Sequence, residues 1–159
     1  MSFLSLVSLS AVAANGLLAG TSLDQSVKQL PARKRIGAVA YSAYTQAADL
    51  GNGIPLYATL GIGAACLSVA AAVLGWHIGT EATRLPAVLA GVLAVLHSAA
   101  TSQAAPTMFS QRRAQGNEAA LANIFDRFAR WQGLRCVLQL VNFVALLWLW
   151  TSVMATAGQ

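Results

Sequence analysis

The hydrophobic positions of this chain fall into four long segments that alternate with polar connections. The apolar segments cover residues 3–21, 54–77, 85–103 and 134–157. Each is close to the roughly 20 residues that an α-helix needs to cross about 30 Å of hydrocarbon. Of the 159 residues, 57% are hydrophobic and only 9% are charged, far below the charged share of a soluble domain. The pattern predicts an all-α protein, an integral membrane four-helix bundle that forms a single domain over residues 1–159.

The polar connections have a helical periodicity of their own. Ser22 and Gln25 have the spacing of a capping box, and Pro31 follows at the distance at which it ends a short helix. In the next stretch, apolar residues recur every three or four positions with Asp49 on the polar side, which predicts a helix at the membrane surface. A third apolar stripe is predicted to run into the last span through Gly133. The predicted amphipathic helices cover residues 23–30, 35–50 and 118–133.

Basic residues gather in the first and third connections. Nine of the ten Lys and Arg residues lie there or directly after the third connection, at Lys28, Arg33, Lys34, Arg35, Arg112, Arg113, Arg127, Arg130 and Arg135. Lys and Arg in short connections stay in the cytoplasm. The protein is therefore predicted to lie in the cell membrane, with connections one and three in the cytoplasm and both termini on the outer side. The formal net charge of +5 predicts contact with anionic lipid headgroups on the cytoplasmic face. We expect no nucleic acid partner, because the charges flank spans without an aromatic stacking surface.

Several polar residues are expected at one depth inside the predicted spans. Asn15, His97 and Asn142 lie on three different spans, each about 9 to 12 Å from the cytoplasmic end by the helical rise. Polar groups are costly at this depth and are by default candidates for function. The predicted polar pocket contains Asn15, Thr59, His97, Arg135, Gln139 and Asn142. The alternative, equally open, is that Asn15, His97 and Asn142 only form hydrogen bonds between helices.

The helix that enters the last span has a large side chain, Arg or Trp, at every fourth residue. Arg127, Trp131 and Arg135 share this spacing. They are predicted either to anchor the helix by reaching lipid phosphates or to form a cationic wall for an anionic or phenolate ligand.

His97 is the natural candidate for a proton acceptor, because it is the only histidine expected inside the bilayer. His77 lies at the outer end of its span, too far away to share a metal with it. No span has paired His or carboxylate ligands at i and i+3 or i+4, and neither Cys66 nor Cys136 belongs to a CxxC motif. We therefore predict no metal and no other cofactor.

Two stretches of the chain resemble a known family. Residues 18–54 and 117–135 are similar to the anthrone oxygenase family of small four-span membrane proteins, many of whose members are classed as a domain of unknown function. The second stretch has the family's asparagine-rich approach to a Trp and an Arg before the last span, here Asn117, Asn123, Trp131 and Arg135. Where the family has an Asn between that Trp and Arg, this chain has Gly133 or Leu134. The resemblance implies a four-span fold and the oxidation of anthrones to anthraquinones without a metal or flavin.

Two functional hypotheses from different classes follow. In the first, the protein is a cofactor-independent oxygenase of a lipophilic aromatic substrate: His97 takes a proton and Arg135 holds the oxyanion, while Asn15 and Asn142 orient the ring. In the second, it is a non-catalytic accessory subunit or a small-molecule-binding protein, and the polar layer is packing. A membrane protein partner or a homo-oligomer is open under both hypotheses. A transporter is disfavoured, since there is no internal inverted repeat and no carboxylate inside a span.

Overall fold

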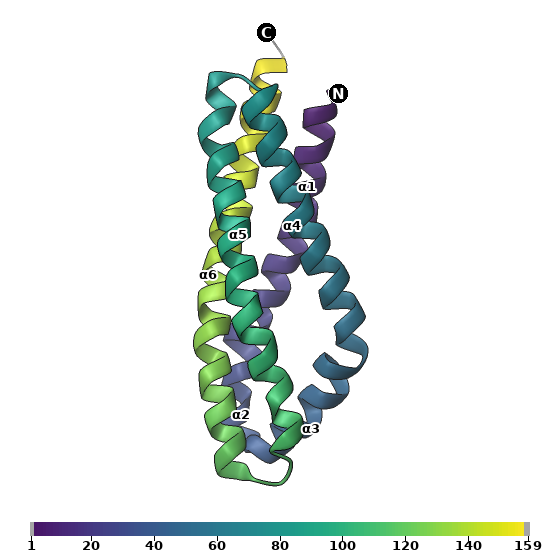
Figure 1. The fold of residues 1–159 in the computed structure, drawn as a ribbon, viewed down its shortest axis with the longest axis vertical. Coiled ribbons are helices and arrows are strands. Elements are labelled where there is room, and N and C mark those ends of the chain that lie inside the picture. The colour runs from purple at the N-terminus through teal and green to yellow at the C-terminus, as the bar shows by residue number, and fades with distance from the viewer. Residues whose placement is uncertain (1, 158–159) are drawn as a thin grey trace.

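The computed structural model describes residues 2–157, and 94% of it is helical. Four long helices run up and down along one axis, with both termini at the same end (Figure 1). Around the bundle, α1 contacts α4, α4 contacts α5, α5 contacts α6, and α6 closes the ring on α1. The four helices are α1 (Phe3–Asp24), α4 (Gly53–His77), α5 (Glu81–Phe109) and α6 (Glu118–Ala157). No strand occurs among the described residues, so the predicted all-α four-helix bundle is confirmed.

Short helices cluster at the end opposite the termini (Figure 1). They are the π-helical turn η1 (Gln25–Gln29), α2 (Leu30–Ile36), α3 (Ala38–Ala47), a second π-helical turn η2 (Ala48–Asn52) and the 3-10 turn η3 (Ser110–Arg113). We call this the basic end of the bundle, because it contains Lys28, Arg33, Lys34, Arg35, Arg112 and Arg113. The opposite end is called the terminal end.

The short helix predicted over residues 23–30 is instead part of a longer one. Helical structure continues from Phe3 to Ile36 without a break at Ser22. Pro31 does not end the helix, because it lies in the first turn of α2, where a missing backbone N–H is tolerated. The chain turns at Gly37, whose φ of 84° favours glycine. On the other side of the bundle, α6 runs through Gly133 without interruption.

The stretch predicted as a surface helix over residues 35–50 packs against the bundle. Tyr41 on α3 is fully buried, and its ring meets Phe125 of α6 edge-on at 4.9 Å between centroids. Ser42 and Thr45 donate to Gln111 Oε1 at 2.9 and 3.0 Å, which joins α3 to η3, the turn that follows α5. The stretch is therefore a wall of the bundle at its basic end.

The helices are longer than a membrane is thick. Four stretches are long and apolar enough to cross a membrane, Phe3–Ile36, Ala38–His77, Glu81–Arg113 and Glu118–Thr156. Stretches of 34, 40, 33 and 39 residues correspond to about 50 to 60 Å of helix, against about 30 Å of hydrocarbon. The chain is a multi-pass membrane protein whose bundle extends beyond the hydrocarbon.

Two apolar cores hold the bundle, one near each end. The core at the terminal end is built on small residues, and a Cβ added at Gly75 would lie 2.9 Å from Ala87 Cβ and 3.2 Å from Leu149. The core at the basic end contains larger side chains, among them Tyr41 and Phe125. Between the cores, α4 leaves the bundle: it is buried at Ala64, Ser68, Ala71 and Gly75, whereas residues 54–59 are all exposed.

Candidate functional site

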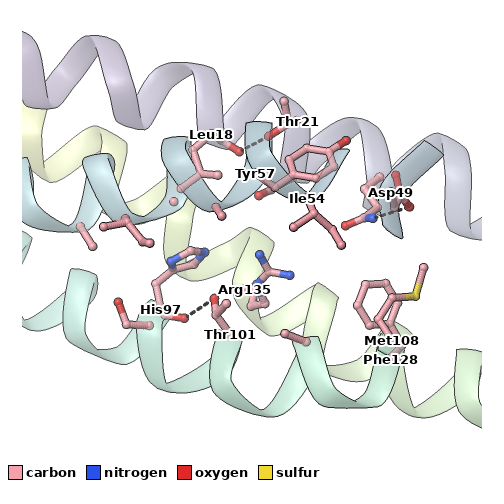
Figure 2. Close-up of a pocket in the computed structure, with 18 of the residues that line it drawn as sticks. Leu18, Thr21, Asp49, Ile54, Tyr57, His97, Thr101, Met108, Phe128 and Arg135 are labelled. Carbon is pink, nitrogen blue, oxygen red and sulfur yellow. Dashed lines mark hydrogen bonds between the residues drawn. The ribbon is translucent and has the colours of Figure 1, made fainter. Parts of the chain in front are cut away.

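A cavity of about 500 Å³ lies between the two cores, where α4 bows away from its neighbours (Figures 1 and 2). Side chains from α1, α4, α5 and α6 line it, and most of them are apolar. The apolar lining includes Leu18, Ile54, Ile62, Met108, Phe109 and Phe128. A space of this size and character is typical of a binding site for a small lipophilic molecule.

The sequence of α4 explains why the space stays open. Ile54, Ala58, Gly61 and Ala65 line the cavity and follow one another at helical spacing. Three of these four residues have one side-chain carbon or none, and a Cβ added at Gly61 would meet nothing within 4 Å. The inner face of α4 is therefore too small to fill the interior at this level.

His97 of α5 and Arg135 of α6 line the cavity with their nitrogen-containing side chains (Figure 2). Ser98 and Thr101 of α5 line it too, but their hydroxyls donate to backbone carbonyls of the same helix. His97 is only 6% exposed, and its Nε2 has no hydrogen-bond partner within residues 2–157. Arg135 donates from Nη1 to Gln132 Oε1 at 2.9 Å, while its Nε also lacks a partner among these residues. Both atoms are buried, and we refer to them as the open nitrogens because each lacks a hydrogen-bond partner among the described residues. None of the three ion pairs in the described part of the chain includes Arg135.

Asn15, Gln139 and Asn142 do not line this cavity; they bind one another. Gln139 Nε2 and Asn142 Nδ2 donate to Asn15 Oδ1 at 2.8 and 3.0 Å. Asn15 Nδ2 in turn donates to Ser68 Oγ at 2.9 Å and to the carbonyl oxygen of Ala64 at 3.3 Å. The network joins α1, α4 and α6 and is at most 1% exposed. For these three residues, the geometry is that of hydrogen bonding between helices.

The network also closes the cavity on the side of the termini. Leu18 and Arg135 line the cavity, and Asn15 and Gln139 lie about one turn further along the same helices. Ser68, which is fully buried, completes the layer from α4. The open nitrogens of His97 and Arg135 therefore lie near the closed end of the cavity, next to a layer whose hydrogen bonds hold three helices in place.

Two other predicted site residues lie away from the cavity. Thr59 is exposed on α4 and is not part of the lining. Trp131 packs against the core at the basic end.

Arg127 is exposed on the surface of α6, whereas Arg135 points inward. Arg127 and Arg135 are eight residues apart, and over eight residues of an α-helix the side-chain direction rotates by about 80°. The spacing of four residues between Arg127, Trp131 and Arg135 therefore does not produce one continuous wall.

The basic end of the cavity contains polar groups that the sequence reasoning missed. Asp49 lies on η2, is 8% exposed, and accepts a hydrogen bond from Gln25 Nε2 of η1 at 3.4 Å. The Tyr57 ring lies between this end and His97 (Figure 2).

The sequence carried one weak signal for this second group. Asp49 directly precedes an apolar span and is followed by Gly51 and Gly53, which permit an irregular backbone. The two π-helical turns, each of which inserts an extra residue into the helical repeat, were not predicted from the sequence. Such insertions occur frequently at functional sites.

Residues 2–157 contain no group of three or more His, Cys, Asp or Glu side chains close enough to hold a metal ion. Cys66 and Cys136 are both free, the first exposed and the second buried.

Comparison of the chain with models of protein families, with curated proteins and with solved structures finds no match. The chemistry of the site therefore has to be judged from its own groups: an imidazole that can take a proton and a guanidinium that can hold an anion, within apolar walls.

Proposed function

We propose that this protein binds a lipophilic aromatic molecule in the cavity and oxidises it with molecular oxygen, without a cofactor. The observation that carries the proposal is the pair of open nitrogens on His97 and Arg135 near the closed end of an apolar cavity of about 500 Å³. A buried polar atom without a partner costs free energy, and a ligand that supplies a hydrogen bond would recover it. The resemblance to anthrone oxygenases implies the same class of reaction.

The reaction that fits these groups begins with a proton transfer. The substrate has a CH₂ group conjugated to a carbonyl, and the imidazole of His97 takes one of its two protons. The electron pair of the broken C–H bond moves towards the carbonyl oxygen, which becomes an oxyanion. Arg135 holds this oxyanion through its guanidinium N–H groups. The result is an electron-rich carbanion that reacts with oxygen directly.

The remaining steps balance without another reductant. The carbanion forms a C–O bond to O₂, and the peroxide takes the proton from His97. The imidazole then removes the second C–H proton, the O–O bond breaks, and the leaving hydroxide takes that proton as water. In sum, CH₂ and O₂ give C=O and H₂O. The apolar walls serve this chemistry by keeping competing water away from the carbanion.

The open flank of the bundle supports entry from the membrane. Residues 54–59 at the start of α4 are all exposed, with Leu56 at 60%. A lipophilic molecule dissolved in the bilayer would pass this thin wall more easily than the tightly packed terminal end. In this proposal the cavity is loaded laterally.

A second candidate function is binding without catalysis. It is favoured by the network of Asn15, Gln139 and Asn142, whose bonds to one another serve packing and leave fewer groups to orient a substrate. The accessory subunit or small-molecule-binding protein expected from the sequence would use the same cavity. The two functions differ in whether His97 is needed for turnover or only for binding.

The experiment that separates them uses anthrone as substrate and the purified protein in lipid nanodiscs. We expect anthraquinone to form faster than in protein-free nanodiscs, with one O₂ consumed per molecule and one ¹⁸O from ¹⁸O₂ in the product. His97→Gln, which keeps a polar side chain but cannot act as a base, should reduce the rate to that of the protein-free control. A wild-type rate equal to that control, combined with tight binding of the product, would establish the binding function instead.

We also propose that the basic end faces the cytoplasm, where Lys and Arg in short connections remain and can contact anionic lipid headgroups. The test places single cysteines in a Cys66→Ala, Cys136→Ala background. Ser2→Cys should react with a membrane-impermeant maleimide in intact cells, and Lys34→Cys should react only after permeabilisation. The reverse pattern would invert the orientation.

A further inference from the structure

The end of the cavity opposite His97 contains a buried carboxylate with little to bind it. Asp49 is 8% exposed, and its side chain accepts one hydrogen bond, from Gln25 Nε2 at 3.4 Å. Hydrogen bonds from N–H groups to a carboxylate are commonly about 2.7 to 2.9 Å when a charge assists them, so this contact is long. None of the ion pairs among residues 2–157 includes Asp49. The carboxylate keeps most of its capacity to accept hydrogen bonds.

Arg135 presents the opposite charge to the same cavity and is likewise outside every ion pair of the described chain. The two groups lie apart along the bundle axis: Phe128, which lines the cavity at the Asp49 end, is seven residues before Arg135 on α6 (Figure 2). Seven residues correspond to about 10 Å of helix. The carboxylate and the guanidinium are therefore too far apart to neutralise one another.

The wall between these two polar ends is mostly apolar. Ile54, Ala58 and Gly61 line it, and Tyr57 is the aromatic ring between the ends. The hydroxyls of Thr21 and Thr101 also lie there, but each donates to a backbone carbonyl of its own helix. A buried charge is tolerated when a partner of opposite charge or a hydrogen-bond donor is supplied to it. One bound molecule can supply both partners only if it is elongated, apolar in the middle and polar at each end.

We infer that Asp49 is a second recognition contact, and that the ligand is a fused-ring aromatic molecule with two polar groups: a carbonyl oxygen that binds Arg135 and an outer-ring hydroxyl that donates to Asp49. This inference rests on the proposed function, since it names the substrate class of the same cavity. It adds a requirement that the oxygenase reaction itself does not have: a hydroxyl donor on an outer ring, away from the reacting carbon. Gln25 orients the Asp49 carboxylate and leaves its second oxygen for the ligand.

Two quinones of the same three-ring skeleton test the inference. 2-Hydroxyanthraquinone has a carbonyl for Arg135 and one hydroxyl on an outer ring, whereas anthraquinone has the carbonyls but no hydroxyl; neither is consumed by oxygen. Dissociation constants are measured by ultraviolet and visible absorbance with the whole protein in nanodiscs. We expect 2-hydroxyanthraquinone to bind the wild-type protein about tenfold more tightly than anthraquinone, which is the effect of one hydrogen bond to a charged group.

Asp49→Leu removes the acceptor at nearly constant volume. It should weaken the binding of 2-hydroxyanthraquinone about tenfold and change the binding of anthraquinone less than twofold. Asp24→Leu is the matched control, because Asp24 lies at the same end, is paired with Lys28 on the surface and does not line the cavity. If Asp49→Leu lowers the thermal stability, Asp49→Asn serves instead, because it keeps the shape of the side chain and removes only the charge. It should weaken the binding of 2-hydroxyanthraquinone, by less than Asp49→Leu does, and leave the binding of anthraquinone unchanged.

Each result has a definite meaning. Equal binding of the two quinones by the wild type, or equal weakening of both by Asp49→Leu, would overturn the second contact while leaving the cavity as a binding site. Failure of both quinones to bind would remove the proposed function together with the inference. Loss of anthrone turnover in His97→Gln with unchanged quinone selectivity would support both.

Discussion

Filling the cavity from α4 should reduce ligand binding and stabilise the protein at the same time. Gly61 lines the cavity, and a Cβ added there meets nothing within 4 Å. Gly61→Leu therefore adds a side chain without moving the backbone. Replacing an interior helical glycine by a good helix former stabilises a helix by roughly 0.5 to 1 kcal/mol. The free energy of unfolding should rise by that amount.

The effect on binding has the opposite sign. Four added carbon groups occupy about 100 Å³ at the packing density of a protein interior, which is a fifth of the cavity volume of about 500 Å³. A ligand seated between Gly61 and Arg135 then has to shift or displace a side chain. Overpacking of this kind costs about 1 to 3 kcal/mol, so the dissociation constant should increase by a factor of about 5 to 150.

Gly63→Leu is the matched control. It makes the same change on the same helix, a Cβ there also meets nothing within 4 Å, and Gly63 does not line the cavity. The assay combines thermal unfolding in nanodiscs with titration of 2-hydroxyanthraquinone. Both variants should be stabilised, and only Gly61→Leu should bind more weakly. The same affinity for both variants would show that the ligand does not occupy this cavity.

Three further substitutions separate catalysis, anion binding and packing. His97→Phe should abolish anthrone oxidation while the bundle remains folded, as measured by turnover and thermal unfolding; full turnover would exclude His97 as the base. Arg135→Lys should weaken quinone binding or turnover about tenfold, because Lys lacks the planar donor geometry of Arg, whereas the exposed Arg127→Lys should have no effect. Asn15→Ala should lower the free energy of unfolding by about 1 to 3 kcal/mol through loss of the interhelical network; an unchanged unfolding temperature would contradict the structural role assigned to it.

The number and type of the long elements were predictable from the sequence. Backbone N–H and C=O groups cannot be left unpaired in hydrocarbon, so an apolar run of about 20 residues has to be a helix. The lengths of the helices were not predictable in the same way. Pro31 and the capping-box spacing at Ser22 are typical of helix boundaries, yet helical structure continues to Ile36. Pro31 is tolerated there because it lies in the first turn of α2, directly after the π-helical turn η1.

The candidate site was predictable only as a set of residues to choose from. Depth along a span follows from the helical rise, and depth selected His97 and Arg135 together with Asn15, Gln139 and Asn142. Depth says nothing about which way each side chain points. The rotation of each helix about its axis depends on close contacts such as that of Gly75 with Ala87 and Leu149.

The sequence by itself determined that this is an all-α membrane protein of four spans, because the cost of unpaired backbone groups in hydrocarbon acts on every apolar run locally. Only the tertiary structure decided that Asn15 forms hydrogen bonds with other helices and that Thr59 is exposed. It also decided that Asp49, which lies in the connection before α4, lines the same cavity as His97. Those outcomes depend on how four helices pack and where α4 leaves the bundle, and packing is a property of residues distant in the chain.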